Sequence, residues 1–199
     1  MTLGLSCALR VLYLFAGAER KAALPSCLRA LTEEFNKSAD FDFAVDLQCI
    51  EIDILRGGKD HDLSVKARRD ALLQQVLDRE FDIAISTPPC SNHTRALFAN
   101  AQGPKPTRDF YHPRGFPRLT PAERTKTDLA NTLVDFSLEV LSAAADVGAI
   151  GFLEFPEDLG ATARGVPASL WQLPSAKALS DKGHHRVPFT KMNGRTWTF

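Results

Sequence analysis

The apolar segment 81–86 ends just before two consecutive prolines, Pro88 and Pro89, and this feature constrains the fold more than any other. The segment is rich in β-branched residues, which is typical of a short buried strand. Proline has no N–H to donate to a neighbouring strand, so the ladder has to stop there. The next residue is Cys90, and a cysteine is strongly nucleophilic as its thiolate. Because ligands of open α/β sheets bind at the carboxyl ends of strands, we expect a rigidly mounted thiol at that edge. The alternative is a buried structural cysteine beside a turn.

Apolar segments alternate with helical segments along the chain, which is the α/β pattern. The predicted strands are 11–15, a stretch within 43–54, 81–86 and 149–153, and the predicted helices are 20–34, 65–79, 120–146 and 169–180. Thr120, Pro121 and Glu123 have the order of an N-cap, a first-turn proline and a capping box, and Gly148 is the expected stop. We therefore expect an α/β fold with a mostly parallel sheet and helices on both faces.

Two further segments have distinctive patterns. Residues 96–119 contain four prolines and no periodicity, and an irregular stretch of that length in a compact domain is usually functional or disordered. Residues 187–199 flank an Asn-Gly turn, which predicts a hairpin. The 199 residues, 44% of them hydrophobic, suit a single domain over 1–199.

Charge and cysteine usage exclude several classes of protein. The formal net charge is zero, which argues against binding nucleic acid by bulk charge, but 95–126 holds seven basic and two acidic residues. The four cysteines are widely spaced without a CxxC pair, so we expect no metal site, no disulfide framework and an intracellular, reducing compartment. The apolar stretch 137–153 carries Glu139 and Asp146, so we expect no membrane span.

Three predicted strand ends carry the residues that indicate a family: Phe15-Ala16-Gly17, Pro88-Pro89-Cys90 and Glu154. In this order they resemble the DNA (cytosine-5) methyltransferase family, a branch of the S-adenosylmethionine-dependent methyltransferases, over roughly residues 10–160. That family has a Phe-x-Gly-x-Gly turn, a Pro-Pro-Cys nucleophile motif and a strand ending Glu-Asn-Val. Here Glu19 replaces the second glycine and Phe155 replaces the asparagine.

The resemblance implies a Rossmann-like methyltransferase fold and methyl transfer to C5 of cytosine in DNA. Cys90 would add to C6 of the ring, which makes C5 nucleophilic. Glu154 would hold N3 and stabilise the charge that develops there. Because Phe155 cannot form the hydrogen bonds of the family asparagine, Glu154 would need other support.

The resemblance also implies S-adenosylmethionine as cofactor. The residues it assigns to the cofactor are Phe15, Ala16, Gly17, Asp53, Asp62 and Pro88. Glycine lets the backbone approach the methionine portion closely. An acid after the second strand would accept hydrogen bonds from ribose hydroxyls, with Asp53 the first choice and Glu51 the second. Asp62 would contact adenine; the alternative for each acid is a solvated loop carboxylate.

The basic segment after Cys90 suggests a nucleic-acid contact. Its predicted phosphate-binding residues are Arg95, Arg108, Arg114 and Arg118, and they alternate with aromatic residues that could stack on bases. In the family, the loop after the nucleophile closes over a flipped base. The alternative is a solvated loop whose aromatic residues pack on the domain.

Two other functions stay open at this point. Members of the family continue into a target-recognition domain, and no segment here is long enough to be one, so the chain would be a divergent or truncated relative. It could then be a catalytically inactive module that binds nucleic acid or cofactor. One branch of the family methylates tRNA, so RNA is an alternative substrate.

Overall fold

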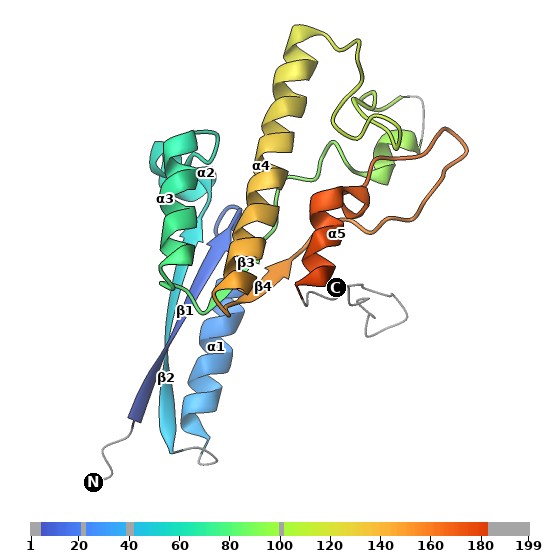
Figure 1. Ribbon diagram of the computed structural model, residues 1–199. Coiled ribbons are helices and arrows are strands. Elements are labelled where there is room, and N and C mark those ends of the chain that lie inside the picture. The colour runs from blue at the N-terminus through green and yellow to red at the C-terminus, as the bar shows by residue number, and fades with distance from the viewer. Residues whose placement is uncertain (1–4, 21–22, 39–41, 100–101, 183–199) are drawn as a thin grey trace.

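The protein is built on a four-stranded parallel sheet with the strand order β2-β1-β3-β4 (Figure 1). The computed structural model describes residues 5–20, 23–38, 42–99 and 102–182, and the hairpin predicted for 187–199 lies outside them. The strands are β1 (Leu5–Leu14), β2 (Phe43–Ile52), β3 (Ile83–Ser86) and β4 (Ile150–Leu153). All three strand pairings are parallel, so the predicted α/β class and parallel sheet are confirmed.

The first four helices connect successive strands, and the fifth follows β4. They are α1 (Leu24–Lys37), α2 (Ile54–Gly57), α3 (Lys66–Leu77), α4 (Pro121–Asp146) and α5 (Pro174–Asp181), with short 3-10 turns η1 (Gly58–His61), η2 (Arg95–Phe98) and η3 (Leu170–Gln172). Helix α1 begins later than predicted because Pro25 suits only a first turn. The predicted helix 169–180 is divided, because the residue before Pro174 is extended.

Helix α4 has the start and stop that its sequence predicts. Thr120 Oγ1 accepts from the Glu123 backbone N–H while the Glu123 carboxylate accepts from the Thr120 backbone N–H, which is a complete capping box. The helix ends before Gly148, whose φ of 82° is the left-handed conformation that closes a helix. Its buried residues, among them Val134 and Leu141, pack in the main core.

The centre of the sheet is buried on both faces. Leu12 and Leu14 of β1 belong to the core that α4 covers. The alternate residues Val11 and Tyr13 point to the opposite face, and they too are buried. Right-handed crossovers place α1 on this second face and α3 and α4 on the first, because β2 and β3 flank β1 on opposite sides.

The second face becomes open toward β4. Ile150 and Phe152 of β4 lie in register with Ile83 and Ile85 of β3, on the face to which Val11 and Tyr13 point. Ile150 is 56% exposed and Phe152 is 51% exposed. The more completely buried face of the sheet is therefore the first face, where α3 and α4 cover β1 and β3 and support the carboxyl ends of these two strands.

Candidate active site at the strand ends

The carboxyl ends of β1, β3 and β4 lie side by side. Leu14 pairs with Ser86, and Ser86 pairs with Leu153, so the three strands end in one row. The residues that follow are tied together: Thr87 Oγ1 donates to the Phe15 carbonyl oxygen at 2.9 Å, and the Glu154 N–H donates to the Ser86 carbonyl oxygen at 3.0 Å. This row brings the predicted cofactor turn, the Pro-Pro-Cys segment and Glu154 to one edge.

The turn after β1 is held by residues from the end of β2. Phe15 and Gly17 have φ values of 62° and 70°, so both adopt the left-handed region. The Gly17 N–H donates to Asp53 Oδ2 at 2.9 Å, and Arg56 Nε donates to the Gly17 carbonyl oxygen at 2.7 Å. Asp53 Oδ1 accepts from the Leu55 N–H at 2.8 Å, so Asp53 is also the N-cap of α2.

Glu51 of β2, the second acidic residue predicted to bind the ribose, forms ion pairs with two arginines. Arg29 of α1 approaches Glu51 Oε1 at 3.1 Å, and Arg56 pairs with Oε2. The Glu51 carboxylate is mostly buried, with 12% of the side chain exposed. Both predicted ribose acceptors thus lie beside the Gly17 turn, and both have protein partners.

The remaining residue predicted to bind cofactor, Asp62, has a local role in the structure. Its Oδ1 accepts from the Ser64 N–H at 2.9 Å, and the hydrogen bonds from the Ser64 side chain and then from its backbone N–H lower the pKa of the Asp62 carboxyl. An aspartate that accepts from the backbone two residues on forms an Asx-turn. Asp62 therefore turns the chain from η1 into α3, and its predicted contact with adenine stays a prediction.

Cys90 is half-buried and packs against the main core. Burial raises the pKa of its thiol, and the negative charge of Glu154 raises it further. Cys90 and Glu154 follow adjacent strands whose ends lie in one row, which brings the thiol within the electrostatic influence of the Glu154 carboxylate. Because both causes favour the neutral form, Cys90 is a protonated thiol at neutral pH.

The turn after Cys90 carries a buried histidine that the sequence did not single out as important. The His93 N–H donates to the Cys90 carbonyl oxygen at 2.9 Å, and the His93 side chain is buried. Its ring meets Phe155 edge-on, with 5.2 Å between the ring centroids. Phe155 therefore supports the segment after Glu154 by packing.

Arg108 corrects one prediction: it is only 1% exposed, so its guanidinium is not available to phosphates. The guanidinium donates to His93 Nε2 at 2.7 Å, to the Pro113 carbonyl oxygen, to Asn131 Oδ1 and to the Thr127 carbonyl oxygen. All four acceptors are neutral, so this is a buried charge without a carboxylate bonded to it. Arg108 thus joins the turn after Cys90 to the predicted loop and to α4.

Burial and nearby charges fix the protonation states of His93 and Arg108. Burial and the positive charges of Arg108 and Arg114 lower the pKa of His93 to about 3, so its ring is neutral at physiological pH. Burial lowers the pKa of Arg108 to about 10, which leaves it charged. Arg108 is then the donor, His93 Nε2 is the acceptor, and the proton of the imidazole is on Nδ1.

The other predicted phosphate-binding arginines do not form one cluster with Arg108. Arg95 donates to the carbonyl oxygens of Leu159 and Ala161, which ties the turn after Cys90 to the segment after β4. Arg114 pairs with Asp135 of α4 at 2.7 Å and Arg118 is exposed. The irregular segment predicted for 96–119 begins inside the 3-10 turn η2, and its described remainder over 102–119 is irregular and built around buried Arg108.

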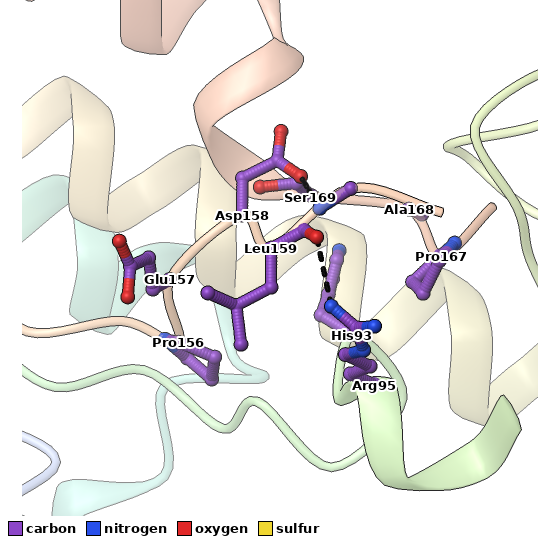
Figure 2. Close-up of a pocket in the computed structure, with 10 residues that line it drawn as sticks. His93, Arg95, Pro156, Glu157, Asp158, Leu159, Pro167, Ala168 and Ser169 are labelled. Carbon is purple, nitrogen blue, oxygen red and sulfur yellow. Dashed lines mark hydrogen bonds between the residues drawn. The ribbon is translucent and has the colours of Figure 1, made fainter. Parts of the chain in front are cut away.

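Figure 2 shows a small pocket between the turn after Cys90 and the segments that follow β4. It is lined by His93, Arg95, residues 156–160 and residues 167–169. The bond from Arg95 to the Leu159 carbonyl oxygen crosses it. The pocket lies next to Phe155, which follows Glu154, and sequence reasoning did not anticipate it because its two sides are far apart in the chain.

Among the described residues, no three histidine, cysteine, aspartate or glutamate side chains gather where they could hold a metal ion. Over the same part of the chain, no helix has the length and apolar character that crossing a bilayer requires. No protein-family model, curated protein or solved structure matches this chain. Function is therefore inferred from the strand-end residues themselves.

Proposed function

We propose that this protein transfers a methyl group from S-adenosylmethionine to C5 of cytosine in DNA, with Cys90 as the nucleophile. The observation that carries the proposal is that Cys90 and Glu154 follow the adjacent ends of β3 and β4, which the Glu154 N–H to Ser86 carbonyl bond ties together, and that the charge of Glu154 raises the pKa of the thiol there. A thiol and a carboxyl group are the two groups needed to activate a cytosine, because C5 is a poor nucleophile until C6 has been attacked.

The raised pKa of Cys90 suggests how the two groups act together. The thiol proton would pass to the neighbouring Glu154 carboxylate while sulfur forms a bond to C6. The protonated Glu154 can then donate to N3, which receives the negative charge. After C5 has taken the methyl group, the N3 proton returns to Glu154, the C5 proton is lost to water and the carbon–sulfur bond breaks, which restores the aromatic ring. The departing thiolate then takes the proton from Glu154, so that the neutral thiol and the carboxylate are regenerated.

The residues beside β1 fit the chemistry of the cofactor, which supplies the methyl group as an electrophilic sulfonium when bound. Gly17 offers backbone without a side chain next to the strand end, and Glu51 and Asp53 provide carboxylates for ribose hydroxyls. Asp53 already accepts two N–H bonds, but a carboxylate has about four acceptor sites, so it can hold the turn and a hydroxyl together.

A trapping experiment tests the proposal. DNA containing 5-fluorocytosine is incubated with the protein and cofactor, because fluorine at C5 blocks the final elimination and preserves the covalent adduct. We expect mass spectrometry to find DNA bound to Cys90 in the parent and in Cys49→Ser, and no adduct in Cys90→Ser. Cys49 is a matched control, since it is also half-buried and burial raises its pKa. An adduct that persists in Cys90→Ser would refute the assignment.

A second candidate is a methyltransferase-like protein that binds nucleic acid without turnover. The observation that favours it is internal pairing at the cofactor turn, where Gly17 bonds to Asp53 and Arg56, and Glu51 pairs with two arginines. Calorimetric titration with S-adenosylmethionine separates the two functions. Binding that weakens in Asp53→Ala supports the enzyme, whereas no heat of binding supports the inactive module.

A further inference from the structure

The two ends of the loop 107–116 are bonded to each other, and the loop is anchored to α4. The Phe116 N–H donates to the Thr107 carbonyl oxygen at 2.9 Å, which brings the two ends of the loop together. Arg108 donates across the inside of the loop to the Pro113 carbonyl oxygen, and it also bonds to α4. Compact loops with adjacent ends and an internally packed side chain are frequently functional. Burying a guanidinium that bonds only to neutral acceptors lowers the stability of the folded protein. Its presence here indicates that the conformation of this loop serves the function of the protein.

The anchored loop 107–116 presents two large aromatic rings to solvent. Phe110 is 46% exposed and Tyr111 is 75% exposed, and their rings meet edge-to-face with 5.4 Å between centroids. The Phe110 N–H donates to the Val166 carbonyl oxygen at 3.0 Å, which fixes the backbone under the rings. Adjacent exposed aromatic rings on an anchored backbone are typical of an interaction site, because little freedom is lost when they bind.

The charge around the two rings indicates the kind of partner. Residues 102–126 contain six basic and two acidic residues. Of the basic residues, Arg108 is buried and Arg114 and Arg124 pair with aspartates of α4, whereas Lys105, Arg118 and Lys126 are exposed. Both acids have partners inside the segment, because Asp109 bonds to His112 and Glu123 to Thr120. Exposed cations in the same segment as two exposed aromatic rings match a polyanion with flat, stackable groups, which is an unpaired nucleic-acid strand.

We propose that Phe110 and Tyr111 form a stacking surface for unpaired bases of DNA, with Lys105 and Arg118 contacting the backbone. This inference rests on the proposed function for the choice of DNA as partner. The part of the substrate that the loop recognises is a single-stranded stretch, or bases exposed by distortion of a duplex. The aromatic residues of the basic segment can act in this way because the buried Arg108 anchors the loop that carries them.

Fluorescence anisotropy tests the proposal with a labelled single-stranded DNA of about 16 nucleotides, the upper end of common site sizes. The protein carries Cys90→Ser and no cofactor is added, so the result does not depend on methyl transfer. We expect the Kd to rise about fivefold or more for each ring lost in Phe110→Ala and Tyr111→Ala. The matched control is Phe152→Ala, which removes a similarly exposed ring from β4.

Salt dependence distinguishes stacking from charge contacts. The double variant Phe110→Ala/Tyr111→Ala should bind weakly with an unchanged salt slope, whereas Lys105→Gln/Arg118→Gln should lower the slope by about 0.7 for each phosphate contact. If the alanine variant fails to fold, Phe110→Leu/Tyr111→Leu keeps apolar side chains and should still bind weakly. The proposal is overturned if the parent does not bind, if the alanine variant binds like Phe152→Ala, or if duplex or RNA of the same sequence binds more tightly. Binding without methylation would overturn the proposed enzyme and leave this surface standing.

Discussion

Acid should destabilise this protein in a pH range where most proteins change little, and His93 is the cause. The ring is buried, and its Nε2 accepts a hydrogen bond from the charged Arg108 guanidinium. Protonating Nε2 would break that bond and place two positive charges together. The perturbation is therefore a change of pH, combined with His93→Gln, which removes the titrating group and keeps an acceptor.

The size of the effect follows from the pKa of His93, which falls from 6.5 to about 3 on folding. Above pH 6.5 the ring is neutral in the folded and unfolded chains, so it contributes nothing to pH dependence. As the pH decreases from 6.5 toward 3, the unfolded chain binds a proton that the folded protein excludes, and stability is lost. Integrating proton uptake from about pH 7 to about pH 5 gives a loss of about 2 kcal/mol in the free energy of unfolding.

Urea unfolding followed by circular dichroism at these two pH values measures the effect. We expect the parent to lose about 2 kcal/mol more than His93→Gln does over the interval. The control is His112→Gln, which changes a histidine with 45% side-chain exposure in the same segment and should keep the dependence of the parent. If His93→Gln shows the same loss as the parent, His93 is not the buried neutral partner of Arg108, and the reasoning fails.

Three further predictions concern single positions. Gly115→Ala should cost about 2–3 kcal/mol by urea unfolding, because its φ is 115° and a Cβ would lie 2.8 Å from the Thr127 side chain; Gly148→Ala, with positive φ but open space, should cost about 1 kcal/mol. Thr120→Ala should cost about 1 kcal/mol in the same assay through loss of the α4 cap, and an unchanged midpoint would contradict the capping box. Glu154→Gln should speed alkylation of Cys90 by iodoacetamide near neutral pH, because it removes a charge that raises the thiol pKa; an unchanged rate in peptide mapping would show that the two groups are not close.

The parts of the fold predicted from sequence are those with local causes. The start of α4 follows from Thr120 and Glu123, and its end follows from Gly148, because each feature acts within one turn of the helix. The meeting of Gly17, Cys90 and Glu154 at one edge was also predictable. Parallel strands joined by helices all end at the same side of the sheet, so residues after the strands have to meet there.

The parts that sequence reasoning missed depend on contacts between distant segments. Arg108 looks like any loop arginine, and only the acceptors that α4 supplies explain its burial. The packing of Phe155 against His93 is likewise a contact between two loops, which the sequence around Phe155 does not indicate. Asp53 was predicted as a ribose acceptor, and its bonds to Gly17 and Leu55 became visible only in three dimensions.

The most direct test of the central claim is to ask what the protein does to a nucleic acid. DNA of mixed sequence is incubated with the protein and S-adenosylmethionine carrying a deuterated methyl group, and the DNA is digested to nucleosides for mass spectrometry. Methyl transfer through Cys90 predicts labelled 5-methylcytosine with the parent and none with Cys90→Ser. Labelled methyl on a nitrogen atom of a base, or no labelled nucleoside from a parent protein that binds cofactor and DNA, would contradict it.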